Sequence, residues 1–474
     1  MKGDNVSVTC PLRAMALEAP EAVAVAVVRR NISFDELDRL VSAAALRLGE
    51  LEPGSRVALY LPKDERYVVL VLALIRAGHV ACPISDRLPP RSVAPLLKRA
   101  GCSALISDDE ELLQAADLYK LVPEALLESG SPSDGTGPTD IPLDRPATII
   151  FTSGSTGAPK AALHTFGNHY YSALGSNANI ALAPGDRWLH SLPLYHVGGL
   201  SILFRCLLAG ATITLPEPGT PTGEGINVLG ATHVSLVATQ LLRLLREDTD
   251  PSVLKAVLLG GGPVSDSLVD EALTRRLPVH TSYGLTEMAS QVTTTPPGAS
   301  PEELRTAGRV LPNREVSISD VREILVRGET LFAGYAQGEK VDRPLDAGGW
   351  FHTGDLGWLD DDGCLRVTGR RDNLFISGGE NVQPEEIEEA LCRFVGVDEA
   401  VVVPVPDEEF GSRPVAFVRT NAVALEPEHL ARSLEPVLPR FKIPISFHPW
   451  PDGVGMKPDR TALGELALRL HRGS

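Results

Sequence analysis

Between about residue 55 and residue 285, short apolar runs alternate with longer stretches of helical periodicity. Runs such as "VALYLP", "ATIIF", "THVSLV" and "KAVLLGGG" are largely apolar, and helical segments such as "YVVLVLALIRAG" lie between them. Strands that are apolar throughout and separated by helices are typical of parallel sheets with helices on both faces. The sequence therefore predicts an α/β fold with at least one doubly wound layer, and we expect two.

The pattern changes twice in the second half of the chain. After about residue 300, shorter alternating strands with glycine turns ("EVSISD", "EILVRG", "GCLRVTG") predict a small antiparallel or β-barrel-like piece. Beyond "GRRDN" a β, helix, β order follows, with Pro384 and two acidic residues at an expected helix start. We therefore expect a large N-terminal domain at 1–370 and a small, mobile α+β C-terminal domain at 371–474.

Charge and hydropathy limit the partners. The chain has 44 Lys and Arg against 61 Asp and Glu, a formal net charge of -17, which argues against nucleic acid or an anionic membrane held by charge alone. The start "MKGDNVSVTC" lacks the apolar core of a secretory signal, and the run "YVVLVLALI" is too short to span a bilayer. We expect a cytoplasmic protein with no stable membrane association, whose six cysteines lack paired spacing and hold no zinc.

The stretch "FTSGSTGAPK" (151–160) places glycines, hydroxyl residues and a lysine directly after an apolar run. Backbone N–H groups of a glycine-rich turn can form a phosphate-binding nest, and flanking hydroxyls and a lysine add donors. It is not a Walker loop, because the register G-x-x-x-x-G-K-[ST] is absent; on composition alone, a plain loop is the alternative. The candidate phosphate-binding residues are Thr152, Ser153, Gly154, Ser155, Thr156, Gly157 and Lys160.

Four motifs together resemble those of the adenylate-forming superfamily, which contains acyl- and aryl-CoA synthetases, carrier-dependent adenylation domains and firefly luciferase. They are "TSGSTGAPK", "YGLTE" (283–287), "GWFHTGDLGWLDDDGCLRVTGRRDN" (349–373) and "SGGENVQPEEIE" (377–388), in the superfamily's order and spacing. The resemblance covers nearly the whole chain. It implies that a carboxylic acid attacks the α-phosphorus of ATP to give acyl-AMP, and that a thiol then displaces AMP. ATP, Mg²⁺ and CoA as co-substrate are expected.

The resemblance also implies roles for single residues in nucleotide binding. Glu287 would bind Mg²⁺, a cation that prefers oxygen ligands, and Thr286 would donate to the α-phosphate. Asp355 would accept from both ribose hydroxyls, and Arg370 would contact ribose and phosphate. Tyr283 would offer a flat face to adenine, and glycines without a Cβ would let the backbone approach the ligands. The glycines concerned are Gly261, Gly262 and Gly284.

In the C-terminal part, the resemblance implies a hinge at Asp372, about which the small domain swings between adenylation and thioester-forming poses. The catalytic lysine is expected at Lys457 in "GVGMKPDR", where it would stabilise charge developing between the carboxylate and the α-phosphate; Lys442 is the alternative. Gly378 and Gly379 would let the backbone approach the pantetheine chain of CoA.

The stretch "SLPLYHVGGLSILFRCLLAG" (191–210) gives information about which carboxylic acid is the substrate. His196 would gate the acyl and thiol tunnels, or simply cap a helix. Arg205 lies among apolar residues and needs an anionic partner, which is either a second substrate carboxylate or a protein acid. With "YGLTEMASQVTT" and "GMKPDRTALGEL", this stretch is similar to the branch that activates o-succinylbenzoate, a dicarboxylate of menaquinone biosynthesis. The acyl site would then contain His196, Arg205 and Gly262.

Other readings stay open. The chain could be another aryl- or fatty-acyl-CoA synthetase, or a free-standing adenylation domain whose carrier is a separate protein. A nucleotide-binding sensor or scaffold that retains the fold is the non-catalytic alternative. The expected partners are small molecules, namely a carboxylic acid, ATP and CoA; the oligomeric state stays open, with a homodimer as one option.

Overall fold

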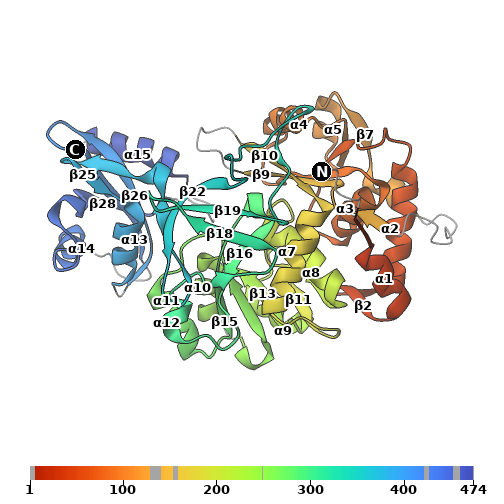
Figure 1. Cartoon of the computed structure of the whole chain (residues 1–474), viewed down its shortest axis with the longest axis horizontal. Coiled ribbons are helices and arrows are strands. Elements are labelled where there is room, and N and C mark those ends of the chain that lie inside the picture. Colours follow the sequence, from red (N-terminus) through yellow and green to blue (C-terminus); the bar gives the residue numbers. More distant parts are fainter. Residues whose placement is uncertain are drawn as a thin grey trace.

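The computed structural model of the protein describes residues 6–128, 140–152, 159–247, 249–394, 396–420, 426–451 and 459–472. Its elements form a large N-terminal part and a small C-terminal part at the opposite end of the long axis (Figure 1). Within the described ranges, no helix combines the length and the hydropathy needed to cross a membrane.

The first sheet has eight strands in the order β21-β20-β10-β9-β5-β4-β6-β7. Strands β4 to β7 and β9 run parallel, as the apolar sequences of β4 and β9 predict, whereas β10, β20 and β21 extend the sheet antiparallel. Their bounds are β4 (Arg56–Tyr60), β5 (Val80–Pro83), β6 (Ala104–Ser107), β7 (Tyr119–Leu121), β9 (Pro146–Thr152), β10 (Lys160–Thr165), β20 (Gly334–Gln337) and β21 (Lys340–Asp342).

The second sheet has nine strands in the order β17-β16-β15-β14-β13-β11-β12-β2-β3. The six inner strands from β15 to β2 are parallel, and β3, β16 and β17 are antiparallel additions at the edges. The bounds are β2 (Val23–Val27), β3 (Arg30–Ser33), β11 (Arg187–Leu189), β12 (Thr212–Leu215), β13 (His233–Leu236), β14 (Ala256–Leu259), β15 (Val279–Leu285), β16 (Ser290–Thr294) and β17 (Arg309–Val310).

One hydrophobic core joins the two sheets through the helices between them. It contains Val57 from the first sheet, Ile213 from the second and Leu203 from α8, all less than 1% exposed. These helices start and stop at clear signals: α3 begins after Asp64, whose side chain accepts from the Tyr67 N–H, and ends at a left-handed glycine. The N-terminal helices are α1 (Pro11–Glu18), α2 (Phe34–Leu48), α3 (Glu65–Ala77), α4 (Ala94–Ala100), α5 (Glu110–Ala115), α6 (Pro123–Leu127), α7 (Phe166–Asn179), α8 (Val197–Ala209), α9 (Thr222–Leu229), α10 (Ala238–Arg246), α11 (Asp266–Thr274) and α12 (Pro301–Leu304).

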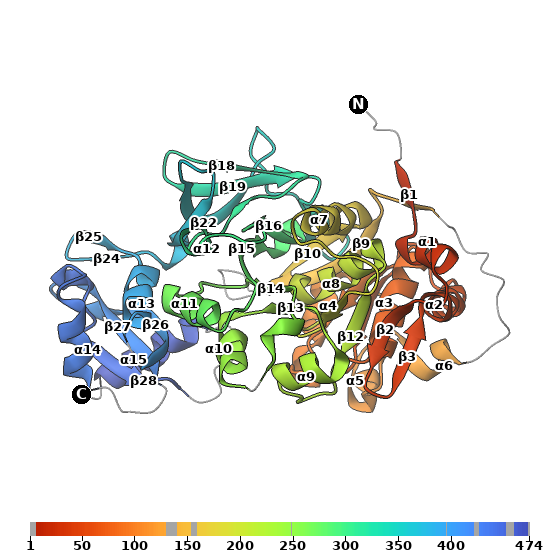
Figure 2. The same ribbon diagram turned by 90° about the horizontal axis from the view of Figure 1, so that it is seen from below.

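The predicted antiparallel piece is a four-stranded sheet in the order β18-β19-β22-β23. Its outer strands β18 and β23 do not pair with each other, so the sheet is open and not a closed barrel. Figure 2 shows β18 and β19 on the opposite side of the molecule from α9. The bounds are β18 (Arg314–Ile318), β19 (Glu323–Gly328), β22 (Phe351–Leu359) and β23 (Leu365–Arg370), and the remaining short pair is β1 (Ser7–Thr9) with β8 (Asp140–Pro142).

The C-terminal part has a three-stranded sheet, β26-β27-β28, and its own hydrophobic core. Helix α13 begins at Pro384 as predicted, with Glu385 and Glu386 in its first turn. The hydrogen bonds between the two parts include those from Arg246 to Asp398 (2.8 Å) and from Ser267 Oγ to the Cys392 carbonyl (3.0 Å). The bounds are β24 (Phe375–Ser377), β25 (Glu380–Val382), α13 (Pro384–Cys392), β26 (Val397–Asp407), β27 (Gly411–Thr420), α14 (Pro427–Leu434), β28 (Ser446–Pro449) and α15 (Arg460–Arg472).

Candidate active site

The predicted phosphate loop lies between two paired strands. Thr152 ends β9, Lys160 starts β10, and the two residues are directly opposite in the antiparallel register. The predicted residues Ser153, Gly154, Ser155, Thr156 and Gly157 lie outside the described residues. The ammonium group of Lys160 lies 4.9 Å from the ring centroid of Tyr335 on the neighbouring strand β20. The lysine is thus held at the loop's exit, beside an aromatic ring.

Glu287 lies in a tight turn between β15 and β16. It is 9% exposed, and its Oε1 accepts a hydrogen bond from the Tyr335 hydroxyl (2.5 Å). Two and three residues after Glu287, Ala289 (φ 53°) and Ser290 (φ 132°) have positive φ angles that are costly for side-chain-bearing residues. On the other side, the Thr286 carbonyl accepts from His164 Nε2 (2.7 Å). The surrounding strands therefore hold the turn in an otherwise unfavourable backbone conformation.

The donor set at Glu287 fits a magnesium ion that arrives with phosphate. No group of three or more His, Cys, Asp or Glu side chains able to hold a metal occurs among the described residues. Mg²⁺ is commonly bound by one or two carboxylates together with substrate phosphates and water. A single, nearly buried carboxylate near the lysine of a phosphate loop suits that mode, and an all-protein metal cage does not fit.

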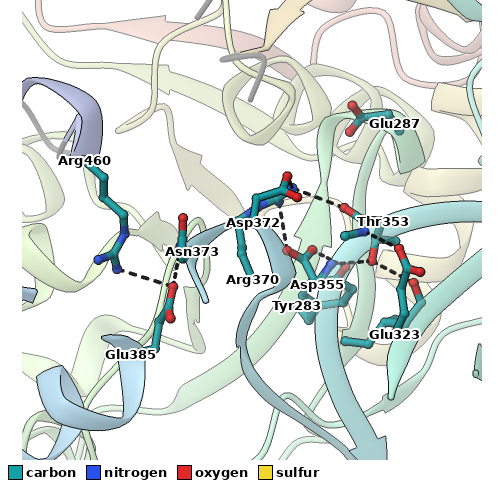
Figure 3. Close-up of polar contacts among 12 residues, drawn as sticks. Tyr283, Glu287, Glu323, Thr353, Asp355, Arg370, Asp372, Asn373, Glu385 and Arg460 are labelled. Carbon is teal, nitrogen blue, oxygen red and sulfur yellow. Dashed lines mark hydrogen bonds and ion pairs between the residues drawn. The ribbon is translucent and has the colours of Figure 1, made fainter. Parts of the chain in front are cut away.

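Asp355 lies at the centre of a polar cluster (Figure 3). Its Oδ2 accepts from the Tyr283 hydroxyl (2.6 Å), and its Oδ1 accepts from Arg370 Nη1 (2.9 Å). Asp355 and Arg370 are register partners on β22 and β23, so the strand pairing itself brings them together. Burial, followed by the charge of Asp355, raises the pKa of Tyr283 well above its ordinary value, which keeps its hydroxyl a donor. Three predicted nucleotide-binding residues thus form one cluster.

A buried acid that the sequence reasoning missed holds this cluster in place. Glu323 is 2% exposed; its Oε1 accepts from the Gly354 N–H (3.0 Å) and its Oε2 from Arg371 Nη1 (2.9 Å). The adjacent Thr353 donates to the Ile324 carbonyl (2.7 Å). Residues of β19 therefore hold the "HTGD" segment in place. The only local feature of the sequence that points to Glu323 is its position as an acid directly before the apolar run "ILV".

The predicted glycines have two different structural settings. Gly261 (φ 82°) follows β14 in a conformation that favours glycine, and a Cβ on Gly262 would meet nothing within 4 Å. A Cβ on Gly284 would lie 2.3 Å from the Ser290 carbonyl oxygen, so this glycine is needed for the close approach of β15 and β16. Open space beside Gly262 is compatible with a ligand close to the backbone.

Arg205 lies on α8 with none of its surface exposed. Its Nη2 donates to Ser290 Oγ (3.0 Å), and its guanidinium carbon lies 5.1 Å from the ring centroid of Trp188. Its Nε and Nη1 have no hydrogen-bond partner, and no carboxylate pairs with it among the described residues. Burial lowers the pKa of Arg205 to about 10. The alternative of a salt bridge to a protein acid therefore has no support in the described part of the chain.

His196 precedes α8 and is exposed. It is the N-cap residue, but its side chain makes no capping hydrogen bond, and its ring packs edge-on against Tyr195 with centroids 4.8 Å apart. Its predicted role as a gate stays a prediction.

The remaining predicted residues lie at or beyond the junction with the C-terminal part. Asp372 is exposed, 3.9 Å from Arg370, in the short turn that follows β23. Gly378 (φ 60°) and Gly379 (φ 84°) connect β24 and β25 in conformations that favour glycine. Lys457 lies outside the described residues, whereas Lys442 is paired with Glu386 (2.5 Å). A lysine already paired with an acid is a weaker candidate for catalysis.

Comparison with known proteins defines the class. A model of the AMP-binding enzyme family matches residues 12–336, and a model of the AMP-binding enzyme C-terminal domain matches residues 386–452. The chain therefore belongs to the AMP-binding enzyme family, which confirms the predicted resemblance. The predicted domain boundary at 370 falls between the two matched segments.

Individual relatives are more specific. The chain is 33% identical over 445 residues to a 2-succinylbenzoate–CoA ligase of Bacillus cereus (90% of this chain, 92% of the relative). It is 35% identical over 455 residues to a protein of that name from Bacillus pumilus (91% and 92%). Among solved structures, it resembles the o-succinylbenzoate CoA synthetase of Bacillus subtilis in complex with the acyl-adenylate OSB-AMP, with a TM-score of 0.87 at 31% identity (97% and 98%). The complex of the Bacillus subtilis enzyme with ATP and magnesium ion also gives 0.87 at 31% (97% and 100%). These structures confirm the predicted α/β fold with its large N-terminal and small C-terminal domains.

Proposed function

We propose that this protein is an ATP-dependent, AMP-forming acid–thiol ligase that converts o-succinylbenzoate, ATP and CoA into o-succinylbenzoyl-CoA, AMP and pyrophosphate, a step of menaquinone biosynthesis. The observation that carries the choice of acid is Arg205, a fully buried arginine whose guanidinium pairs with no carboxylate of the described chain. A buried charge without a partner is unfavourable, and the second carboxylate of this acid would supply one. The names of the relatives support the same choice.

In the first half-reaction, an oxygen of the succinyl carboxylate attacks the α-phosphorus of ATP, the bond to the β-phosphate bridge breaks, and pyrophosphate leaves. Lys160 and the preceding loop hold the phosphates, and Asp355 with Arg370 holds the ribose, beside the Tyr283 ring. When bound at Glu287, Mg²⁺ neutralises phosphate charge. Lys457 would stabilise the charge that develops between the carboxylate and the α-phosphate.

In the second half-reaction, the CoA sulfur attacks the acyl carbon, and AMP leaves with the bonding electrons of the former acyl–oxygen bond. We place the hinge for the change between the two half-reactions at Asp372, where β23 ends and the C-terminal domain (371–474) begins. Gly378 and Gly379 would then approach the pantetheine chain, and His196 would separate the acyl and thiol tunnels. The cytoplasmic location, the absence of nucleic-acid and membrane partners and the homodimer stay predictions.

The test is turnover with purified protein, ATP, Mg²⁺ and CoA, measuring AMP and pyrophosphate with one acid at a time. We expect o-succinylbenzoate to be used far better than benzoate, a medium-chain fatty acid or an amino acid. Preference for a mono-acid would favour another acyl-CoA synthetase, and acyl-AMP formation without CoA consumption would favour a carrier-dependent adenylation domain. ADP as the product, or no acid-dependent AMP from folded protein, would refute the proposal.

A further inference from the structure

Tyr335 contacts two oppositely charged residues of the candidate site with two different parts of its side chain. Its hydroxyl donates to Glu287 Oε1 (2.5 Å), and its ring faces the Lys160 ammonium, 4.9 Å from the centroid. The side chain is 8% exposed, so both contacts are made largely away from water. Neither the phosphate-loop motif nor the "YGLTE" motif contains this residue, which lies 48 positions after Glu287.

Three backbone features fix the position of Tyr335. Strand β20 pairs with β10 so that Tyr335 is opposite Ala162, two residues beyond Lys160. Gly334 has φ 140°, and a Cβ there would lie 2.4 Å from the Asp342 carbonyl oxygen, so β20 and β21 can approach only at a glycine. The same segment is hydrogen-bonded to the turn that contains Glu287, because the Phe332 N–H donates to the Glu287 carbonyl (2.8 Å). The phenol ring therefore has a defined place between the loop lysine and the turn.

This placement affects both charges. A lysine and a glutamate that both contact one side chain can form an ion pair with each other. Such a pair would leave Lys160 less able to bind phosphate and Glu287 less able to bind the metal. No such ion pair joins Lys160 and Glu287 in the described chain; the phenol lies against each of them instead. The phenol donates a hydrogen bond and keeps its proton, so it does not neutralise the carboxylate charge. A hydrogen bond to one oxygen also restricts rotation of the carboxylate.

We propose that Tyr335 is a positioning residue that orients the Glu287 carboxylate toward the metal of Mg·ATP and keeps Lys160 from pairing with it. This inference rests on the proposed function, in which Glu287 binds Mg²⁺ and Lys160 binds phosphate. Partners that hydrogen-bond a metal ligand typically contribute roughly 10- to 100-fold to metal affinity. The hydroxyl should therefore matter for the metal, and the ring for the lysine.

The experiment measures the Kd of ATP by calorimetry, once with excess Mg²⁺ and once with EDTA, for the wild type, Tyr335→Phe and Tyr335→Leu. Tyr335→Phe keeps the ring and removes the hydroxyl, so we expect the tightening by Mg²⁺ to fall about 10-fold while the Kd in EDTA is unchanged. Tyr335→Leu should also weaken binding in EDTA, because Lys160 can then pair with Glu287. The matched control is Tyr60→Phe, which removes a hydroxyl that donates to the Leu88 carbonyl (2.8 Å) and should change neither Kd.

The outcomes separate this inference from the proposed function. If Tyr335→Phe keeps the wild-type response to Mg²⁺, or loses affinity equally with Mg²⁺ and with EDTA, the positioning role is refuted and the proposed ligase stands. If the wild type itself binds ATP equally well with and without Mg²⁺, the metal role of Glu287 is refuted, and this inference with it. Circular dichroism and thermal unfolding confirm that each variant is folded.

Discussion

Replacing Arg205 by methionine tests the proposed substrate directly, because this residue combines complete burial with the absence of an acidic partner in the described chain. Burial lowers the pKa of Arg205 from its ordinary value to about 10. At neutral pH this difference corresponds to roughly 3 kcal/mol of unfavourable free energy for the charged guanidinium in the folded protein. The contacts with Ser290 and Trp188 offset part of that cost. We therefore expect Arg205→Met to unfold at the same temperature as the wild type or at a higher one.

The effect on activity should have the opposite sign and depend on the acid. An arginine–carboxylate contact contributes about 1.5–3 kcal/mol, which corresponds to a roughly 10- to 150-fold lower kcat/KM for o-succinylbenzoate. Benzoate lacks a second carboxylate, so its weaker activation should change little. Arg205→Lys keeps the charge but loses the planar fork of donors, and we expect an intermediate loss.

The assay is pyrophosphate release with each acid over a range of concentrations, together with thermal unfolding of the same preparations. The reasoning predicts a selective rise in KM for o-succinylbenzoate without loss of stability. Equal losses for both acids together with a lower unfolding temperature would mean that Arg205 is a structural residue. Undiminished use of o-succinylbenzoate would mean that its second carboxylate is recognised elsewhere.

Three further perturbations test other parts of the site. Lys457→Ala should abolish acyl-AMP formation but spare thioester formation from supplied acyl-AMP, whereas Lys442→Ala should leave both half-reactions intact; single-turnover assays of each half-reaction decide. Asp355→Asn weakens two hydrogen bonds in the nucleotide cluster and should raise the Kd of ATP about 10- to 100-fold in a calorimetric titration. Burial lowers the pKa of His164 to about 4 from 6.5, so only the unfolded chain takes up this proton as the pH falls between those values. The proton uptake of His164 should therefore lower the free energy of unfolding by about 3 kcal/mol over that pH range. The variant His164→Gln keeps a donor for the Thr286 carbonyl and should remove this contribution, as measured by urea titrations at several pH values. A variant with the same pH dependence of stability as the wild type would contradict the prediction.

The sequence predicts those parts of the fold in which a short stretch of residues by itself determines which side chains are buried or where an element begins. Strand β14 (Ala256–Leu259) and strand β4 (Arg56–Tyr60) were recognisable because an apolar run that is buried on both faces has few alternatives. Pro384 fixed the start of α13 for a similarly local reason, since proline suits the first helical turn. The antiparallel sheet was predicted as barrel-like, because alternation alone does not tell whether the edge strands meet.

The contacts between distant segments were not predictable from the sequence. Tyr335 reaches Glu287 across 48 residues, and Arg205 reaches Ser290 across 85. Nothing in the pentapeptide "AGYAQ" indicates a partner 48 residues earlier in the chain. The position of Arg205 was informative only because a charge in an apolar helix is costly wherever the helix packs.

The charged residues proposed to bind the nucleotide and its metal differ in their pairing from the arginine proposed to bind the acid. Asp355 and Glu287, which are proposed to bind the nucleotide and its metal, are already held by neutral or cationic donors of the chain, so they are oriented before ATP arrives. Arg205, which is proposed to bind the acid, has no carboxylate among the described residues and so bears the cost of burial until a ligand supplies one. When an acid with a second carboxylate binds, the new ion pair also offsets the unfavourable free energy of the buried guanidinium. When a mono-acid binds, the guanidinium stays buried without a carboxylate partner. The enzyme can then discriminate between acids because a mono-acid does not form the ion pair with Arg205, and this discrimination does not depend on the size of the pocket.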